Sequence, residues 1–264
     1  MQLAPIAVAA GVRLEALAAV GSTNTQARVR AQQGAQAPLW ITAVEQTEGR
    51  GRIGRSWASP PGNLYASLLL REPSPPERAP ELAFVAALAL RDAVIVEAPG
   101  LARQLAFKWP NDLLLAGEKC AGILIEGDVE PDKGVSAIIG IGVNCQSHPS
   151  VAAYPATNLG AHGAAVAPEQ LFQRLSATMC RRLAQWDRGS GFSAILGDWL
   201  MTARGIGEDI TVRNGSGEMH GRFIGLDQSG RLVLQRRGGG IEKVSAGDVF
   251  PFASPKGPAR SQSG

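Results

Sequence analysis

EQTEGRGRIGRSW, residues 45–57, is the stretch of this 264-residue chain that most restricts its fold. Its glycines follow the pattern G-x-G-x-x-G, which in dinucleotide-binding proteins lies between a strand and the helix after it. A strand-like run, Leu39–Gln46, precedes the pattern, but residues 58–61 read Ala-Ser-Pro-Pro. No helix can follow there, because proline removes a backbone donor and clashes with the preceding helical turn. The sequence therefore favours a glycine-rich ligand loop over a dinucleotide-binding fold.

The same loop carries Arg50, Arg52 and Arg55, and no acidic residue occurs between Glu48 and Glu72. Glycines let the backbone curl around a ligand and turn its N–H groups inward. Guanidinium groups then form charge-assisted bonds with carboxylate or phosphate. The pattern indicates an anion site. A solvated basic turn remains an alternative, and a nucleic-acid patch is a weaker one, because three arginines are few for that purpose.

Residues 107–115, FKWPNDLLL, form a second polar cluster around Pro110. Asn111 and Asp112 also fit an ordinary turn, and that interpretation stays open. Lys108, however, ends an apolar strand, where a lysine is rarely placed without a partner. Lysine beside aspartate suits a phosphate group with its Mg²⁺, because the ammonium group binds oxygen and the carboxylate binds the metal.

Two further segments bring candidate site residues. Lys119 precedes the apolar run Cys120–Glu126, although a lysine there also fits a solvated turn. Ile139–Asn144 reads as a strand with two glycines. Glycine weakens a strand and often marks a place where a ligand comes close. Asn144 at its end could contact a base edge or cap the strand.

The composition sets outer limits. Hydrophobic residues make up 45% and charged residues 19%, so the chain can bury a core and is not disordered over most of its length. A net charge of +3 is too small to indicate bulk nucleic-acid binding. The three cysteines contain no C-x-x-C pair, which argues against a disulfide framework and favours a reducing compartment. The apolar stretch at residues 82–98 is interrupted by Arg91-Asp92, so we expect no membrane span.

The patterning predicts an α+β main domain over residues 1–204, a small all-β module over residues 205–252 and a disordered tail over residues 253–264. Helices are expected at Gln26–Gln33, Glu77–Glu97, Pro168–Trp186 and Phe192–Thr202. Strands of the main domain are expected at Leu39–Gln46, Leu64–Arg71, Leu105–Trp109, Asp112–Leu115, Cys120–Glu126 and Ser136–Asn144. Strands of the module are expected at Ile210–Arg213, His220–Leu226, Leu232–Arg236 and Ile241–Val244.

Taken in order, these motifs resemble those of the biotin–protein ligases, over roughly residues 12–252. The matching pieces are Ser22-Thr23-Asn24, Gln46-Thr47 with the GRGRIGRSW loop, Gly62–Tyr65, Lys108–Asp112, Lys119–Leu124 and Ile139–Asn144. The resemblance implies a mixed-sheet catalytic domain related to class II aminoacyl-tRNA synthetases, followed by an SH3-like barrel. It further implies a ligase that activates biotin as biotinyl-5′-AMP and transfers it to a lysine of a biotin carboxyl carrier protein domain.

The resemblance also implies roles for individual residues. The biotin-binding residues would be Ser22, Thr23, Gln46, Gly49, Arg50, Arg52, Lys119, Gly122, Leu124, Gly140 and Gly142. The ATP-binding residues would be Arg52, Arg55, Lys108, Asn111, Asp112, Lys119 and Asn144. Arg52, Lys119 and Asp112 would be catalytic, and Asp112 would act indirectly on Mg²⁺. We expect residues 48–58 to be mobile without ligand and ordered with it.

The implied substrates are ATP and biotin, with Mg²⁺. The chain looks like the short, monofunctional kind without a DNA-binding domain, and we expect a cytoplasmic monomer or weak homodimer with no DNA or membrane partner. Two features depart from the family's pattern: Glu48, where a small residue is common, and the end of the β-module, Phe250-Pro251-Phe252, which lacks a basic residue.

Three rival functions stay open from the sequence. A lipoate–protein ligase shares the fold and the chemistry, but the arginine-rich loop and the β-module belong to the biotin type. A non-catalytic biotin sensor would lack pyrophosphate release. A nucleotide- or RNA-binding module would use Arg231, Arg236 and Arg237, which more often form an exposed face.

Overall fold

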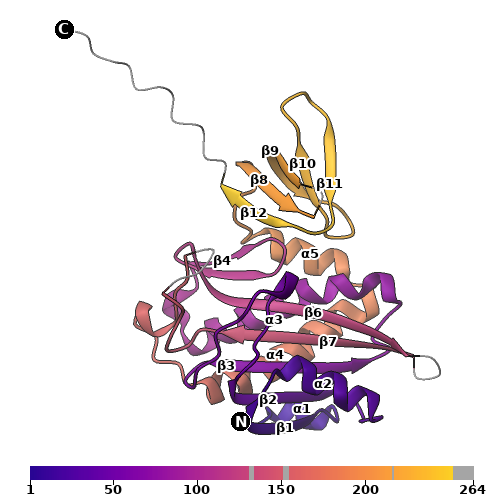
Figure 1. The fold of residues 1–264 in the computed structure, drawn as a ribbon, viewed down its shortest axis with the longest axis vertical. Helices are drawn as coiled ribbons and strands as arrows, with labels where there is room; N and C mark the ends of the chain where they lie inside the picture. Colours follow the sequence, from indigo (N-terminus) through magenta and orange to yellow (C-terminus); the bar gives the residue numbers. More distant parts are fainter. Residues whose placement is uncertain (131–133, 151–154, 216, 252–264) are drawn as a thin grey trace. The chain divides into compact units, whose positions relative to one another are not determined.

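The computed structural model describes residues 1–130, 134–150, 155–215 and 217–251. The chain divides into two compact units. The larger unit contains Met1–Arg204 with Gln228–Gly230, and the smaller one contains Gly205–Asp227 with Arg231–Gly264. Figure 1 shows the ribbon of both units, coloured along the sequence.

The larger unit is built on a seven-stranded sheet in the order β1-β2-β3-β7-β6-β5-β4. The strands are Arg13–Val20 (β1), Leu39–Gln46 (β2), Leu64–Arg71 (β3), Leu105–Lys108 (β4), Asp112–Leu115 (β5), Glu118–Glu130 (β6) and Gly134–Val143 (β7). β1 and β2 are parallel, and every other neighbouring pair is antiparallel. The sheet is therefore mixed, as expected from the sequence.

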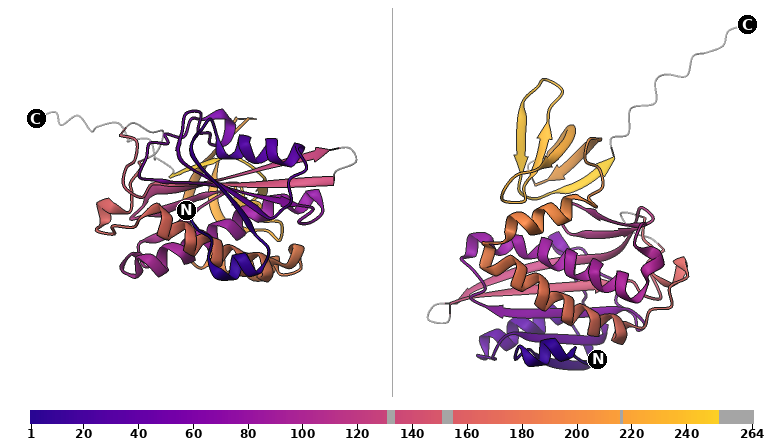
Figure 2. Two further views of the ribbon diagram at one scale, coloured as in Figure 1. Left: turned by 90° about the horizontal axis from the view of Figure 1, so that it is seen from below. Right: turned by 180° about the vertical axis from the view of Figure 1, so that it is seen from behind.

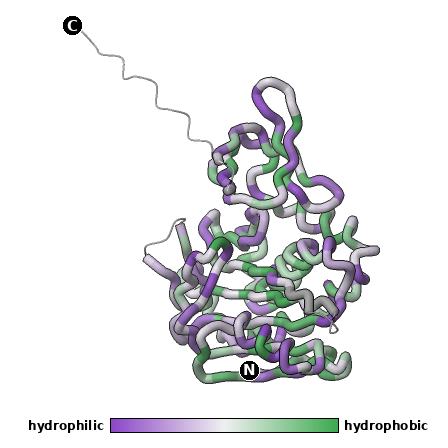
Figure 3. The backbone as a smooth tube through the Cα atoms, turned by 45° about the vertical axis from the view of Figure 1, so that its right-hand side comes forward, coloured by the Kyte–Doolittle hydropathy of each residue, from purple (hydrophilic) through white to green (hydrophobic). Residues whose placement is uncertain are grey.

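Helices cover both faces of this sheet (Figure 2). They are Pro5–Ala9 (α1), Thr23–Gln32 (α2), Leu82–Glu97 (α3), Pro168–Trp186 (α4) and Phe192–Leu200 (α5). α2 lies on one face, while α3 and α4 lie on the other (Figure 2). Because both faces are buried, the strands read as long apolar runs rather than as alternating ones (Figure 3, green).

The alternation of side chains on β2 shows how the two faces are packed. Ile41 joins a fully buried cluster with Ala27 of α2, Leu69 and Ile138. Its neighbour Trp40 points to the opposite face. There its ring meets the ring of Phe172 on α4 edge-on, with the ring centres 5.5 Å apart. Truncating Ile41 would therefore leave a cavity on the α2 face, and truncating Trp40 would leave one on the α4 face.

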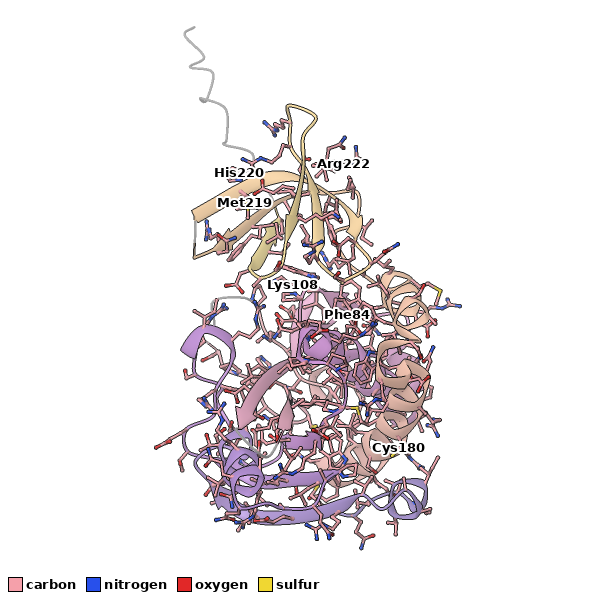
Figure 4. The ribbon with its side chains drawn as sticks, turned by 90° about the vertical axis from the view of Figure 1, so that its right-hand side faces the viewer. Phe84, Lys108, Cys180, Met219, His220 and Arg222 are labelled. Atoms are coloured by element: carbon pink, nitrogen blue, oxygen red, sulfur yellow. The ribbon has the colours of Figure 1, made fainter. Side chains whose placement is uncertain are left out.

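The smaller unit is a five-stranded antiparallel sheet in the order β11-β10-β9-β8-β12. Its strands are Asp209–Asn214 (β8), Gly217–Leu226 (β9), Leu232–Gln235 (β10), Ile241–Val244 (β11) and Asp248–Pro251 (β12). Met219, His220 and Arg222 lie on β9 (Figure 4). The guanidinium of Arg213 lies 4.6 Å from the ring centre of Phe250, a cation–π contact that ties β8 to β12.

Most predicted elements are confirmed, and the differences have local causes. The helix expected from Glu77 begins at Leu82, because the segment Pro76–Glu81 with its internal Pro80 forms a 3-10 turn. The sequence analysis missed α1, β1 and β12. The expected tail lies outside the described residues. In the described part of the chain, no helix has the length and apolarity needed to cross a membrane.

Candidate functional site

Five positions on adjacent strands form one row across the sheet. The β-sheet register pairs Lys108 with Asp112, Asp112 with Gly122, Gly122 with Gly142 and Gly142 with Tyr65. Paired residues point to the same face of a sheet. For Lys108 the face follows from its neighbour Phe107, which stacks on Trp199 of α5 at 5.4 Å on the opposite side. The row therefore places a lysine, a carboxylate and two glycines together on the α2 face.

The indole of Trp57 covers the two glycines of this row. A Cβ atom at Gly142 would lie 2.6 Å from Trp57 Nε1, and one at Gly122 would lie 3.2 Å from Trp57 Cζ3. Both glycines thus make room for the ring. Lys119 Nζ lies 5.4 Å from the centre of the same ring. The indole N–H is buried and has no hydrogen-bond partner among the described residues.

Replacing Gly142 by alanine is expected to lower the free energy of unfolding by about 1–3 kcal/mol, because the added methyl group overlaps the indole of Trp57 and forces it from its place. Urea denaturation measures the effect. Gly127→Ala is the matched control on β6, since the nearest atom to its added Cβ is 3.9 Å away. An equal free energy of unfolding in Gly142→Ala and wild type would contradict the placement of Trp57.

The glycine-rich loop is folded as a tight antiparallel turn. The Trp57 N–H donates to the Gly49 carbonyl at 2.8 Å, and the Gly51 N–H donates to the Arg55 carbonyl at 2.6 Å. At the tip, Ile53 has φ of 55° and Gly54 has φ of 68°, the left-handed region. The turn carries all three loop arginines, and it returns the chain to Trp57 above the sheet.

Arg52 is held by the turn between β4 and β5. Its Nη1 donates to Asn111 Oδ1 at 3.1 Å. Asn111 Nδ2 in turn donates to the Ile123 carbonyl of β6 at 2.6 Å. Both ends of the Asn111 amide are therefore used within the protein, and its orientation is fixed. The Trp109–Pro110 peptide bond that precedes it is cis.

Lys119 and Asp112 form an ion pair between β6 and β5. Lys119 Nζ lies 2.5 Å from Asp112 Oδ1, although the two groups are not aligned as a hydrogen bond. The side chains are 24% and 10% exposed. A carboxylate so poorly exposed requires a counterion. The lysine predicted as an ATP ligand and the predicted base are thus direct partners.

Gln46, at the end of β2, is the centre of a hydrogen-bonded group at the start of α2. Gln46 Oε1 accepts from the Thr23 N–H at 2.8 Å and lies 3.0 Å from Thr23 Oγ1. Gln46 Nε2 donates to Ser59 Oγ at 2.9 Å. Ser59 Oγ donates to the Trp57 carbonyl at 2.9 Å. Ser22 occupies the N-cap position of α2, directly before Thr23, and is buried.

A second set of hydrogen bonds connects Thr23 with side chains of β3 and β6. Ser67 Oγ, which is fully buried on β3, lies 2.7 Å from Thr23 Oγ1 and 2.6 Å from Asn24 Oδ1. Asn24 Nδ2 donates to Glu126 Oε2 at 2.7 Å. A Cβ atom at Gly140 would overlap Asn24 Oδ1, so this glycine makes room for the Asn24 amide.

Glu126 also holds the arginine-rich loop. Arg50 Nη1 lies 3.3 Å from Glu126 Oε1, and Arg50 Nη2 donates to Thr25 Oγ1 of α2 at 3.0 Å. Arg28 Nη2 lies 3.4 Å from the same Glu126 Oε1. One carboxylate thus connects the loop, α2 and β6.

The other predicted site residues lie around this face. Leu124 pairs with Gly140 across β6 and β7, one step along the sheet from the glycine row. Asn144 is buried, and its Nδ2 donates to the Thr157 carbonyl at 3.0 Å, so it braces the following loop. A Cβ atom at Gly49 would overlap the Trp57 carbonyl and Ser59 Oγ.

The buried thiol next to Lys119 is not a nucleophile. Burial raises the pKa of Cys120 to about 12. The Cys120 Sγ donates to the Leu113 carbonyl instead, at 3.4 Å. Burial likewise raises the pKa of Tyr65 to about 12, and its hydroxyl donates to the Pro60 carbonyl at 2.8 Å. The candidate reactive groups of this face are therefore its cations and the Asp112 carboxylate.

The described residues hold no cluster of three or more His, Cys, Asp or Glu side chains that could bind a metal ion by itself. Taken together, the face offers cations for anionic groups, a polar pocket with fixed amides and a row of glycines under an aromatic ring. This set fits a ligand that has both phosphate groups and a small polar ring.

Comparison with known proteins agrees with this chemistry. Residues 17–144 match the Biotin/lipoate A/B protein ligase family, and residues 205–250 match the Biotin protein ligase C terminal domain. The chain is 42% identical over 241 residues to the biotin–(acetyl-CoA-carboxylase) ligase of Paracoccus denitrificans, covering 89% of this chain and 98% of the relative. The chain belongs to the biotin protein ligase family.

Other relatives and solved structures extend the comparison. The bifunctional ligase/repressor BirA of Bacillus subtilis is 34% identical over 238 residues, 87% of this chain and 71% of the relative. The Aquifex aeolicus biotin protein ligase in complex with biotin and ATP has a TM-score of 0.76 at 24% identity, over 90% of this chain and 97% of that one. The Leishmania major biotin protein ligase with biotinyl-5-AMP has a TM-score of 0.62 at 26% identity, over 89% and 99%.

These comparisons confirm the fold class and the family expected from the sequence, including the C-terminal module. The sequence analysis assigned no role to Trp57, Ser59, Ser67 or Glu126, which the structure places within the site. One signal was available: Ser67 interrupts an otherwise apolar strand, Leu64–Leu70. A buried hydroxyl needs a partner, so its position indicated a polar neighbour on that face.

Proposed function

We propose that the α2 face of the sheet binds biotin and ATP, with the roles given below for individual residues. The chain is an ATP-dependent ligase that activates biotin and transfers it to a biotin carboxyl carrier protein domain. The observation that carries the residue assignment is the single row from Lys108 to Tyr65. This row brings Lys108, the Asp112 carboxylate and the glycines under Trp57 onto one face, and Lys119 lies beside the same Trp57 ring.

The polar ring of biotin has two N–H donors and one carbonyl acceptor. Ser22, Thr23 and Gln46 supply partners for it, and the side chains of Thr23 and Gln46 are oriented by their bonds to Ser67 and Ser59. A ligand group left unpaired there would cost about 1–3 kcal/mol. Further biotin contacts are proposed along the loop and the glycine row, at Gly49, Arg50, Gly122, Leu124, Gly140 and Gly142.

The first step joins two anions, because a biotin carboxylate oxygen attacks the α-phosphorus and pyrophosphate leaves. The site must offset the repulsion between carboxylate and phosphate. Arg52 contacts Asn111 and Lys119 pairs with Asp112, so both cations lie at the turn between β4 and β5, where they are proposed to hold the reacting oxygens. Arg55 and Lys108 are proposed to bind the leaving phosphates. Asn111 orients Arg52, and Asn144 is proposed to lie at the adenine ring.

Mg²⁺ fits this site as a partner of the triphosphate. Asp112 supplies one poorly exposed carboxylate oxygen that has no aligned hydrogen bond. Mg²⁺ commonly keeps several waters and takes only one or two carboxylates together with substrate phosphates. Bound in this way, the ion would neutralise developing charge on the pyrophosphate. Activity lost on chelation and restored by added Mg²⁺ is the expected result.

In the second step the acceptor lysine amine attacks the acyl carbon, and AMP leaves. The reference pKa of lysine is about 10.4, so only about one in 10³ is neutral near pH 7. Asp112 is proposed to accept the proton or stabilise the charged amine. Its ion pair with Lys119 holds it at the reacting end of the row.

The glycine-rich loop is proposed to shield the adenylate from water. Limited proteolysis is expected to cleave within residues 48–58 of the free enzyme and to leave this loop intact once biotin and ATP are added, because ordering removes the extended conformation a protease needs. The Arg50–Glu126 contacts give the closed loop its attachment to β6. Equal cleavage with and without both substrates would contradict the shielding role.

Biotin-dependent release of pyrophosphate from ATP tests the proposed function. A second measurement asks whether lipoate competes with labelled biotin for binding. We expect release that saturates with biotin and no competition by lipoate at equal concentration, because the fixed amides match a cyclic urea. Competition by lipoate would assign the site to a lipoate ligase instead.

Three expectations stay predictions: a monomer or weak homodimer, a cytoplasmic location and no binding to DNA.

A further inference from the structure

One hydrogen-bonded chain of side chains runs beneath the proposed ring-binding pocket from β6 to β2. It begins at Glu126, passes through Asn24 and Ser67, and reaches Thr23 and Gln46. The successive contacts are 2.7 Å, 2.6 Å, 2.7 Å and 3.0 Å. Asn24, Ser67 and Thr23 are buried, so water does not replace these contacts. Each donor in this series of side chains must therefore be matched by an acceptor of the same series.

Glu126 sets the direction of this chain, because a carboxylate accepts hydrogen bonds and cannot donate them. Its oxygens also face the guanidinium groups of Arg28 and Arg50. The amide of Asn24 must consequently turn its Nδ2 toward Glu126 and its Oδ1 toward Ser67. Gly140 allows this arrangement, since any larger residue there would overlap Asn24 Oδ1.

The orientation of Asn24 decides what Ser67 does. Ser67 Oγ lies within hydrogen-bonding distance of both Asn24 Oδ1 and Thr23 Oγ1, yet a hydroxyl has one proton. Asn24 Oδ1 can only accept, so the Ser67 proton is used there. Thr23 Oγ1 then receives no proton from Ser67: it donates its own proton to Ser67 Oγ, 2.7 Å away, and keeps its lone pairs as an acceptor.

We propose that Glu126 is a positioning residue that fixes this proton order, so that Thr23 Oγ1 accepts an N–H of the cyclic urea of biotin. The proposal rests on the function above, in which Thr23 contacts that ring. It makes Glu126 a determinant of specificity at a distance, because a ligand with no N–H at this point gains nothing from the prepared acceptor.

Replacing Glu126 by glutamine removes the constraint while keeping the size of the side chain. A glutamine amide can donate to Asn24, which allows Asn24 to turn over and present its Nδ2 to Ser67. Ser67 would then donate to Thr23 and occupy an acceptor position there. We expect biotin to bind Glu126→Gln about tenfold more weakly than wild type, equal to about 1.4 kcal/mol.

The deciding experiment compares biotin with two analogues, each methylated on one of the two ring nitrogens, by calorimetry without ATP. One analogue carries its methyl group in place of the N–H that faces Thr23. Wild type is expected to bind this analogue about 100-fold more weakly than it binds biotin, whereas Glu126→Gln should bind it only about tenfold more weakly than it binds biotin. The ratio of the affinities for biotin and for this analogue is therefore smaller in Glu126→Gln. A general loss of structure would weaken both ligands alike and leave the ratio unchanged.

Two further variants make the outcome unambiguous. Glu15→Gln is the matched control, since Glu15 pairs with Arg30 of α2 through two 2.7 Å contacts away from the site, and it should keep the wild-type ratio. Ser67→Ala removes the proton at issue, so adding Glu126→Gln to it should leave the ratio at the value of Ser67→Ala alone. This second comparison applies even where Glu126→Gln by itself fails to fold.

A wild-type ratio in Glu126→Gln would overturn the proposal, as would a further change of the ratio in the Ser67→Ala background. Thr23→Val distinguishes this failure from failure of the proposed function. If Thr23→Val binds biotin as wild type does, the ring does not contact Thr23 and the site assignment is wrong. If Thr23→Val weakens biotin while Glu126→Gln keeps the wild-type ratio, only the proton order is wrong.

Discussion

Arg52→Ala is expected to slow the formation of biotinyl-5′-AMP by about 10²–10³-fold, the loss typical of removing one fixed donor from a developing negative charge. Arg52 is held at 3.1 Å by Asn111, whose other amide end is fixed to β6. The guanidinium therefore has a fixed partner at the β4–β5 turn when the loop is closed. Rapid-quench measurement of adenylate formation under single-turnover conditions reports this step directly.

The arginine of an exposed ion pair provides the control for this variant. Arg174 pairs with Glu97 on the surface at 2.6 Å, and Arg174→Ala removes the same charge away from the site. We expect its adenylation rate to stay within about twofold of wild type, since surface pairs contribute little. An Arg52→Ala enzyme that forms the adenylate at the wild-type rate would remove Arg52 from the catalytic residues.

Lys119→Ala is expected to lower the rate of adenylation by a similar factor of about 10²–10³, and also to destabilise the protein. The two effects have different causes. The rate falls because a cation at the reacting oxygen is lost. Stability falls by about 1–3 kcal/mol because Asp112, only 10% exposed, loses its counterion.

A double variant separates these two effects of Lys119. In Lys119→Ala/Asp112→Asn the unpaired carboxylate is gone, so the free energy of unfolding should return toward the wild-type value while adenylation stays slow. Urea denaturation measures the first quantity and pyrophosphate release the second. If activity recovered together with stability, Lys119 would be a structural partner of Asp112 and no more.

Much of the fold followed from local patterns. Leu64–Arg71 and Pro168–Trp186 were predicted with the bounds that the structure has, because the first is a continuous apolar run and the second has a helical apolar period that begins at a proline. β1 was missed because Arg13–Val20 lies at the edge of the sheet, so its residues alternate too weakly to indicate a strand. Its pairing with β2 is a long-range contact that no local pattern reports.

The site shows the same limit. The residues that face a ligand stand in recognisable motifs such as Gly49–Trp57 and Lys108–Asp112. The residues that orient them, Ser67 and Glu126, lie in ordinary strand sequence and become meaningful only through the register of β3, β7 and β6. Trp57 was visible in the motif, but its place above Gly122 and Gly142 depends on how the loop turns back over the sheet.

The central claim is that the α2 face of this sheet activates biotin with ATP for transfer to a carrier lysine. Transfer of labelled biotin to a purified biotin carboxyl carrier protein domain, followed by mass spectrometry of the carrier, tests it most directly. The account predicts one biotinyl group per carrier, on one lysine, dependent on ATP and lost in Arg52→Ala and Lys119→Ala. Labelling that persists at the wild-type rate in both variants would contradict it.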